Sequence, residues 1–272
     1  MRAVALHADV LVATSAILQV NCVIVRGGAV QEGQAAGAPD AAGETFVIDS
    51  PILPEELDAL GVLVEQAGFP APNGLLATHA DWDHLLGRLA FAGLALGCAE
   101  SSAERLKDSP GEAQRDLRSF DEGLLIERER PLALGAVQAL PVPGRCAVGD
   151  RELEVYAAGG HTRDGMAILI PRTGVLVAGD YLSAAELPTL GPGGSLDSYL
   201  ATLERLRPLI ANAEHVVPGH GPVLDGARAL AILEEDADYL RALAERGADA
   251  QLPDDRRGAA QRALHEQNVA AL

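Results

Sequence analysis

One short segment of the 272-residue chain concentrates side chains that can bind a metal ion, Thr78-His79-Ala80-Asp81-Trp82-Asp83-His84. It follows directly on the apolar run at residues 75–77, which is typical of a buried strand. Its His and Asp donors stand at positions i, i+2, i+4 and i+5, and this spacing cannot place all of them on one face of a helix or strand. We therefore predict a loop at a strand end, where the donors converge on one centre.

Three more candidate ligands follow predicted strands and are flanked by glycine: His161 in Gly159-Gly160-His161-Thr162, Asp180 in Gly179-Asp180, and His220 in Pro218-Gly219-His220-Gly221-Pro222. Glycine lets the backbone approach a crowded centre closely. One histidine after a strand is usually a packed residue, but this recurring set predicts a metal centre, and its imidazole and carboxylate donors suit zinc, iron or manganese. The remaining histidines, His7, His215 and His265, lack this setting and are expected to be structural.

The composition is that of a folded, acidic protein. The chain is 48% apolar and 22% charged, and its formal net charge is −18. Nucleic acid is not an expected ligand, because a polyanion is bound through clustered Lys and Arg. The widely spaced Cys22, Cys98 and Cys146 predict reduced, buried thiols. We expect a cytoplasmic protein, because no apolar run approaches the ~20 residues of a membrane-spanning helix, and His7 and Asp9 interrupt any N-terminal export signal.

Hydrophobic periodicity and turn residues predict the order of the elements. Strands are expected at residues 10–13, 18–26, 45–49, 74–78, 96–99, 136–140, 152–157, 166–170, 175–178 and 216–217. Helices are expected at residues 54–67, at 85–94, from Ser101 or Ser102 onward, from the N-cap Ser195 to about residue 209, and at 226–246. A flexible loop is expected at residues 27–43.

This order predicts two sheets within one α/β domain that spans residues 1–272. We expect a surface excursion at about residues 100–130, whose highly charged part from residue 107 onward is irregular or forms a helix pair. Residues 226–272 are expected to form a C-terminal helical extension.

With these motifs in this order, the sequence resembles the metallo-β-lactamase superfamily. The match consists of residues 78–84, Gly160-His161-Thr162, Gly179-Asp180 and Gly219-His220-Gly221, and it covers roughly residues 10–225. The resemblance implies a four-layer αββα sandwich with two divalent metal ions, usually Zn²⁺, at the edge of its sheets, and most often hydrolysis. It also implies the ligands: His79, Asp81 and His161 for the first ion, Asp83, His84 and His220 for the second, and Asp180 as the bridge between them.

Asp81 departs from the family pattern, which has histidine at this position. With three carboxylates, two divalent ions leave the centre at a charge of +1, whereas the histidine version leaves +2. A less positive centre is expected to be a weaker Lewis acid. The oxygen donor also favours iron or manganese relative to zinc. The flavodiiron branch of the superfamily similarly has a carboxylate at this place, but this chain has no room for a fused flavodoxin domain.

The predicted function is hydrolysis of a small ester, thioester or lactone, in which a bridging hydroxide attacks the acyl carbonyl and Asp83 orients it and accepts its proton. The alternative is an iron-dependent redox protein, dioxygenase-like or diiron, that uses the same ligands. The carboxylate at Asp81 is the observation that supports this alternative. Nuclease members of the family need an inserted domain, which residues 180–220 are too short to contain. The expected partner is a small-molecule substrate. The sequence does not predict an oligomeric state.

Several residues near the ligands have expected roles. Tyr181 either presents its hydroxyl to a substrate oxyanion or is buried in the core, and Thr162 is expected to support the His161 loop through hydrogen bonding. These two are the candidate substrate-binding residues. Trp82 is expected to pack over the cluster rather than to stack on substrate. For Arg163 and Asp164, the first expectation is a surface ion pair, and the second is a contact with substrate.

Overall fold

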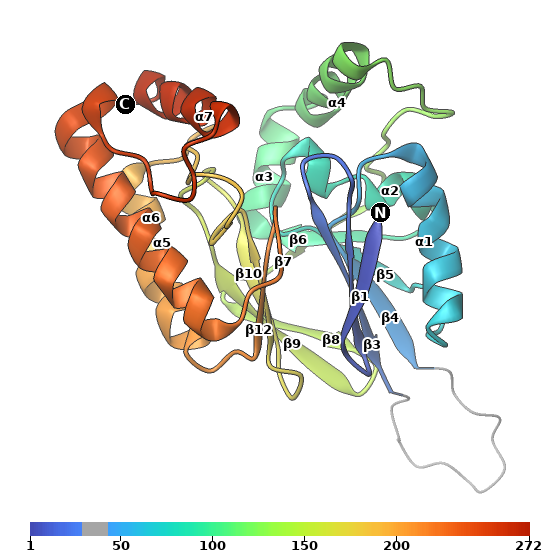
Figure 1. Cartoon of the computed structure of the whole chain (residues 1–272). Helices are drawn as coiled ribbons and strands as arrows, with labels where there is room; N and C mark the ends of the chain where they lie inside the picture. The colour runs from blue at the N-terminus through green and yellow to red at the C-terminus, as the bar shows by residue number, and fades with distance from the viewer. Residues whose placement is uncertain (29–42) are drawn as a thin grey trace, which may run out of the picture.

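The computed structural model describes residues 1–28 and 43–272. Two sheets face each other, and helices cover the outer face of each sheet (Figure 1). This four-layer arrangement confirms the predicted αββα sandwich. Most of the loop that we predicted at residues 27–43 lies outside the described residues.

The first sheet has the order β1-β2-β3-β4-β5-β6-β7, antiparallel from β1 to β4 and parallel from β4 to β7. Its strands are β1 (Arg2–His7), β2 (Val10–Thr14), β3 (Asn21–Gly27), β4 (Glu44–Ile48), β5 (Gly74–Leu76), β6 (Leu96–Ala99) and β7 (Val137–Leu140). The second sheet has the order β12-β11-β10-β9-β8, with only the β11–β12 pair parallel. Its strands are β8 (Gly144–Val148), β9 (Arg151–Ala157), β10 (Met166–Ile170), β11 (Val175–Gly179) and β12 (His215–Pro218).

The helices divide between the two outer faces. Against the first sheet lie α1 (Pro54–Gln66), α2 (Gly87–Ala90), α3 (Glu100–Asp108) and α4 (Glu112–Leu124), with the short 3₁₀ turn η1 (Trp82–His84) before α2. Against the second sheet lie α5 (Leu196–Ile210) and α6 (Gly226–Arg246), and after them come η2 (Gly247–Asp249) and α7 (Ala259–Ala270). Figure 1 shows these two groups on opposite sides of the sandwich.

Three apolar layers hold the four structural layers together, because side chains alternate along each strand. In β3, Val23 and Val25 face the space between the sheets, whereas Cys22 and Ile24 pack on the helices of the first sheet. The same alternation puts residues 175 and 177 of β11 between the sheets and residues 176 and 178 against α5 and α6. Strands buried on both faces are consistently apolar, which explains why their positions could be predicted from the sequence.

Two edge strands were not predicted. β1 is mostly exposed, and β8 at the edge of the second sheet alternates between exposed and half-buried residues. The apolar patterns of these two strands are short or interrupted, because strands at a sheet edge are partly exposed to solvent. Their pairing with β2 and β9 is what makes them strands.

Two helix predictions need correction. The helix expected at residues 85–94 shrinks to α2, because the backbone turns out of the helical region at Phe91, where φ is −129° and ψ is 63°. The next helix begins at Glu100 with Ala99 as its N-cap, not at Ser101 or Ser102. For the charged stretch from residue 107, the helix pair is the predicted alternative that is confirmed, since α4 follows α3 there. Ser195, by contrast, is the predicted N-cap of α5, and its Oγ accepts a hydrogen bond from Ser198 N at 3.3 Å.

The cysteines carry free thiols; Cys22 and Cys98 are buried and Cys146 is half-buried. Among residues 1–28 and 43–272, no helix has both the length and the apolar composition needed to cross a membrane.

Candidate metal centre

All seven predicted ligands lie together at the end of the sandwich where four strands stop. Residues 79–84 follow β5, His161 follows β9, Asp180 follows β11 and His220 follows β12. The close approach of these loops requires glycine at position 219, since a Cβ there would lie 2.0 Å from Asp180 Oδ1. A hydrogen bond from Asn21 N, at the start of β3, to the Gly219 carbonyl at 2.8 Å ties the His220 loop to the first sheet. The centre is therefore built from both sheets.

One group of donors consists of His79, Asp81 and His161. The Asp81 Oδ2 atom lies 3.4 Å from His79 Nε2 and 3.3 Å from His161 Nε2. Both histidines are buried, and Asp81 is about a quarter exposed. Two imidazole nitrogens and one carboxylate oxygen thus face a common point.

A second group consists of Asp83, His84 and His220, all buried. The Asp83 Oδ2 atom lies 3.3 Å from His220 Nε2 and 3.8 Å from His84 Nε2. The two groups have the same make-up, two histidines and one aspartate, and therefore the same formal charge.

Asp180 stands between the two groups. Its Oδ2 atom lies 3.6 Å from His79 Nε2 and 3.3 Å from His161 Nε2, and on the other side 3.5 Å from His220 Nε2. Its Oδ1 atom lies 3.2 Å from His84 Nε2. This one carboxylate thus touches every histidine of the cluster, as a bridging ligand would.

Each of the four histidines turns its Nδ1 atom away from the cluster toward a partner that fixes the ring. The partners are Thr78 Oγ1 for His79 at 3.2 Å, Asp49 Oδ2 for His84 at 3.0 Å, the Thr189 carbonyl for His161 at 2.9 Å and the Leu18 carbonyl for His220 at 2.9 Å. Metal-binding histidines have this arrangement, in which an outer partner sets the tautomer and leaves the inner nitrogen free to coordinate.

The inner atoms of the cluster are short of hydrogen-bond partners. His79 Nε2, His84 Nε2 and Asp180 Oδ1 are buried and have none within the described part of the chain. A buried polar atom without a partner costs free energy, so that its presence here needs an explanation. Two divalent cations fit the donor set, since they would satisfy these three atoms at once.

The carboxylates and histidines also shift one another's pKa values. Burial alone would lower the pKa of His161, but its hydrogen bond to Asp81 and the charges of Asp180 and Asp81 outweigh it and raise the pKa to about 9. The nearby carboxylates likewise raise the pKa values of His84 and His220. In return, the histidines hold the pKa of Asp180 well below its usual range in spite of burial. The carboxylates of the cluster are therefore ionised at neutral pH.

A buried arginine lies beside this cluster and was not predicted from the sequence. Arg105 of α3 has a side chain that is 6% exposed, and its Nη1 atom lies 2.7 Å from Asp81 Oδ1 and 3.0 Å from Asp164 Oδ1. Asp164 was expected at the surface, but its side chain is fully buried, and its Oδ2 atom accepts a hydrogen bond from Ala80 N at 2.9 Å. The expected surface ion pair of Arg163 with Asp164 does not form, and Arg163 pairs instead with the exposed Asp108 of α3.

The two candidate substrate-binding residues are both buried. The Tyr181 hydroxyl accepts a hydrogen bond from His161 N at 3.0 Å and donates one to the Ala158 carbonyl at 3.2 Å. Thr162 Oγ1 donates to the Asp164 carbonyl at 3.1 Å. Both hydroxyls contact the backbone around His161, which fits the loop support expected of Thr162 and the buried alternative expected of Tyr181.

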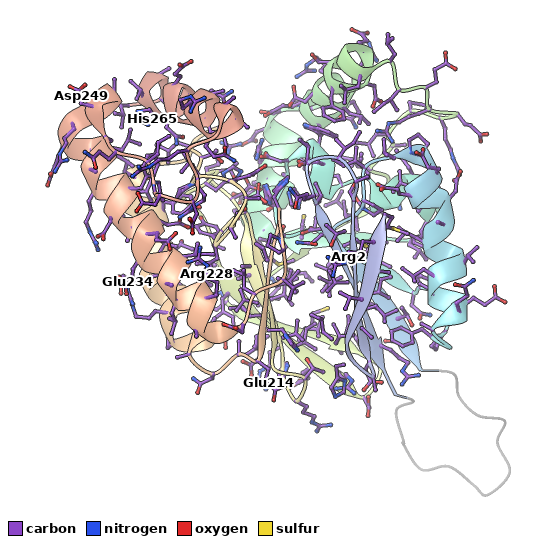
Figure 2. The ribbon with its side chains drawn as sticks, viewed as in Figure 1. Arg2, Glu214, Arg228, Glu234, Asp249 and His265 are labelled. Carbon is purple, nitrogen blue, oxygen red and sulfur yellow. The ribbon has the colours of Figure 1, made fainter. Side chains whose placement is uncertain are left out.

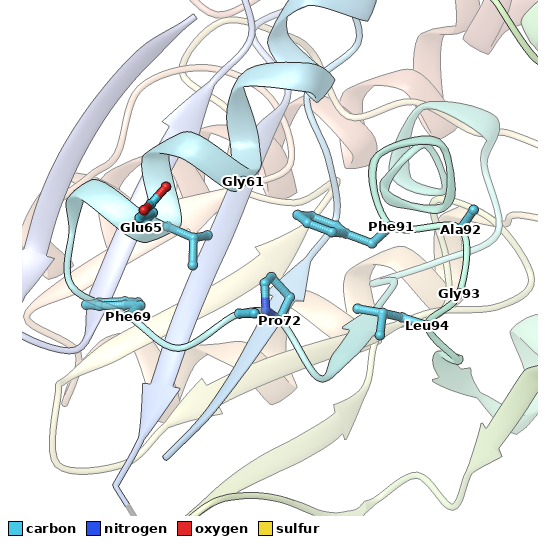
Figure 3. A pocket seen from close by; sticks show the side chains of 10 residues that line it. Gly61, Glu65, Phe69, Pro72, Phe91, Ala92, Gly93 and Leu94 are labelled. Atoms are coloured by element: carbon cyan, nitrogen blue, oxygen red, sulfur yellow. The ribbon is translucent and has the colours of Figure 1, made fainter. Parts of the chain in front are cut away.

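The remaining aromatic and histidine residues lie outside the cluster. Trp82 is half-buried and packs on Phe120 of α4, with ring centroids 4.6 Å apart. His265 lies on α7 (Figure 2), where its Nδ1 atom is 3.0 Å from the Tyr239 hydroxyl. A hollow of about 570 Å³ opens between α1 and the segment after α2, and Figure 3 shows Phe69, Pro72 and Phe91 around it. None of the seven predicted ligands lines that hollow.

Comparison with known proteins agrees with this architecture. A sequence model of the metallo-beta-lactamase superfamily matches residues 52–220. No curated protein matches the chain significantly.

Solved structures share the fold at low sequence identity. A metallo-beta-lactamase family protein from Thermus thermophilus is 21% identical and has a TM-score of 0.64, with 98% of this chain and 95% of that chain covered. The stereoselective inverting sec-alkylsulfatase Pisa1 from Pseudomonas sp. is 16% identical with a TM-score of 0.70, and the match covers 99% of this chain and 49% of that one. A di-iron-bound form of TTHA1623 is 23% identical with a TM-score of 0.54, over 80% of this chain and 96% of that one.

Proposed function

Because the chain belongs to the metallo-beta-lactamase superfamily, we propose that it is a metal-dependent hydrolase that cleaves a small ester, thioester or lactone. The observation that carries this proposal is the cluster of seven ligands, in which Asp180 joins two groups of two histidines and one aspartate. His79, Asp81 and His161 would hold one divalent ion and Asp83, His84 and His220 the other. Two such ions would make water nucleophilic at neutral pH and polarise an acyl carbonyl.

The chain itself supplies a proton acceptor and a rigid frame. Asp83 faces the cluster through Oδ2, 3.3 Å from His220 Nε2, and its side chain keeps 11% of its surface exposed. We assign to Asp83 the roles of orienting the attacking water and taking up its proton. The outer partners of the histidines hold the rings in place, so that the donors need no rearrangement when substrate arrives.

The acidic character of the molecule supports a small substrate that is not a polyanion. The net charge of −18 would fall to −14 with two divalent ions bound, so that the surface stays acidic. We further propose a cytoplasmic location, which the three separate free cysteines support.

Zinc is the ion that we propose first, and iron or manganese second. Asp81 adds a hard oxygen donor where an imidazole was expected, which favours iron or manganese relative to zinc. One structural neighbour has been solved in a di-iron-bound form. These two observations support the second candidate function, an iron-dependent redox protein on the same ligands.

Metal analysis combined with a substrate panel separates the two functions. Protein purified without added metal is assayed against thioesters, lactones and phosphodiesters, together with the variant Asp180→Ala. For the wild type we expect two zinc ions per chain and hydrolysis of a thioester or lactone. The variant should lose the hydrolysis and no longer hold two ions. The exposed Asp238→Ala on α6 is the matched control and should behave like the wild type. Iron with a visible chromophore and no hydrolysis would favour the redox function, and full activity in Asp180→Ala would refute both.

A further inference from the structure

The two oxygens of the Asp81 carboxylate face different partners. Oδ2 is directed at His79 and His161, 3.4 Å and 3.3 Å from their Nε2 atoms. Oδ1 instead lies 2.7 Å from Nη1 of Arg105. A carboxylate can rotate or bind a metal through both oxygens, but an ion pair on Oδ1 leaves only Oδ2 for the cluster. Arg105 thus determines how Asp81 is presented.

Arg105 is itself held in place from several directions. Its Nη1 atom also lies 3.0 Å from Asp164 Oδ1, and its Nη2 atom lies 3.1 Å from Glu112 Oε1 of α4. Asp164 in turn accepts a hydrogen bond from Ala80 N, in the residue next to Asp81. The series Asp164–Arg105–Asp81 therefore links the His161 loop, helix α3 and the loop after β5. A guanidinium group suits this position because its planar fork of donors can bind two carboxylates at once.

Arg105 also moderates the negative charge that Asp81 brings to the cluster. Its one positive charge is shared among the carboxylates of Asp81, Asp164 and Glu112, so that it offsets part of the Asp81 charge and not all of it. The weaker Lewis acidity that the sequence predicted from Asp81 is therefore offset only in part.

We propose that Arg105 is the positioning residue of Asp81: its ion pair with Oδ1 leaves only Oδ2 of the carboxylate to coordinate a metal ion in the cluster. This inference rests on the proposed function, since it requires that His79, Asp81 and His161 hold a metal ion. It also gives α3 a role, because the helix supplies the guanidinium that lets the cluster work with an aspartate in this position.

A double-mutant cycle on the full-length protein tests the proposal through metal binding rather than activity. The variants are Arg105→Met, Asp81→His and the double variant, each examined for Zn²⁺ stoichiometry, for Zn²⁺ affinity by chelator competition and for Co²⁺ absorption. We expect Arg105→Met to weaken one of two Zn²⁺ ions by about 10–100-fold, the usual effect of losing an outer partner. In the Asp81→His background the same substitution should change affinity by less than about 3-fold, because an imidazole has no second carboxylate oxygen for Arg105 to hold.

Controls separate this role from a general effect on folding. Arg88→Met removes another buried arginine, whose Nε atom donates to the Ala133 carbonyl, and should keep both ions. If Arg105→Met does not fold, Arg105→Lys replaces it, because lysine keeps the charge but lacks the fork, and an intermediate loss of affinity is expected. Wild-type affinity in the Arg105 variant, or an equal loss in both backgrounds, overturns the inference alone. A wild-type protein that binds no metal overturns the proposed function instead.

Discussion

At the scale of single residues, the outer partners of the histidines fix the rings whose inner nitrogens form the cluster. Asp49 shows this most clearly. It is 3% exposed, follows β4, and uses both oxygens, since Oδ1 accepts from Thr78 N at 2.8 Å and Oδ2 accepts from Thr78 Oγ1 at 2.9 Å. Its Oδ2 atom also lies 3.0 Å from His84 Nδ1. One carboxylate therefore holds both the first residue of the motif and its last.

We predict that Asp49→Asn weakens metal binding by about 10–100-fold. The amide keeps the shape of the side chain but removes the negative charge that holds the His84 ring with Nε2 directed inward. Isothermal titration with Zn²⁺ measures the effect, with the exposed Asp238→Asn as the control. Unchanged affinity in Asp49→Asn would show that His84 does not depend on this contact.

Residue-level prediction from the sequence found the inner donors but missed their partners. His79 and Asp81 could be found because closely spaced donors follow a predicted strand, and His161 because it follows another strand with glycines beside it. Arg105 could not, since its ion pairs with Asp81 and Asp164 exist only after α3 packs against the strand ends. Asp49 follows an apolar strand, as the predicted ligands do, so this same rule could have located it.

At the scale of elements, the parts that seemed peripheral in the sequence support the centre. Helix α3 provides Arg105, and α4 packs Phe120 on Trp82 within the motif. At the other side, α7 and the segment before it hold the loop that follows Asp180. Arg256 donates to the carbonyls of Ser183 and Glu186, at 3.1 Å and 2.9 Å.

Asn268 of α7 makes the most direct of these contacts. It is 1% exposed, its Oδ1 atom accepts from Leu190 N at 2.9 Å, and its Nδ2 atom donates to the Pro188 carbonyl at 2.7 Å. These two residues flank Thr189, whose carbonyl is the partner of His161 Nδ1. The last helix is therefore connected to a candidate ligand through one short loop.

We predict that Asn268→Ala lowers the free energy of unfolding by about 1–3 kcal/mol for each buried backbone group left unpaired. Denaturant unfolding of the full-length chain measures this loss. Asn212→Ala serves as the control, because Asn212 is exposed and donates only to the Pro208 carbonyl; its effect should stay within about 0.5 kcal/mol. Equal stability of the two variants would contradict the role assigned to α7.

Element prediction succeeded where strands are buried on both faces and failed where burial is one-sided. The bounds of β10 and α6 match the prediction, because their apolar patterns are unbroken. The apolar residues Leu85, Leu86 and Leu89 suggested a longer helix around α2. They are buried in the core, but the chain leaves the helix at Phe91, which local periodicity does not reveal.

At the scale of the whole molecule, the fold keeps several ionisable groups close together, and pH sensitivity is the consequence. Without metal, His161 is stabilised as a cation by Asp81 and Asp180, and its pKa rises from 6.5 to about 9. A group whose pKa is higher in the folded state than in the unfolded state stabilises the fold at pH values below its unfolded-state pKa. This contribution is therefore complete below about pH 6.5 and is lost as the pH rises through about 9.

We predict that the chelator-treated protein becomes less stable between about pH 6.5 and pH 9. The metal-loaded protein should respond in the opposite direction over this range, because protons compete less with the ions for the imidazoles. Denaturant unfolding at several pH values measures both trends. His161→Gln should weaken the trend of the chelator-treated protein without abolishing it, because the pKa values of His84 and His220 are raised as well. His265→Gln, on α7, should leave the trend intact. A chelator-treated protein that gains stability over the same range would contradict this arrangement of charges.

The αββα sandwich could be predicted because the motifs, in their order along the chain, resemble those of the metallo-beta-lactamase superfamily; the order of the elements alone predicted two sheets within one α/β domain. The assembly of the centre from both sheets could not, since the hydrogen bonds from Asn21 Nδ2 to the carbonyls of Pro218 and Gly221 join segments about 200 residues apart in sequence. Such contacts depend on how the two sheets pack, and no local pattern encodes them.

The central claim is that one carboxylate, Asp180, joins two metal sites, and a count of metal ions tests it most directly. The wild-type protein and Asp180→Ala are loaded with Zn²⁺, freed of excess metal and analysed for bound zinc per chain. We expect two ions in the wild type and fewer than two in the variant, with Asp238→Ala retaining two. One ion or none in the wild type, or two tightly bound ions in Asp180→Ala, would contradict the claim.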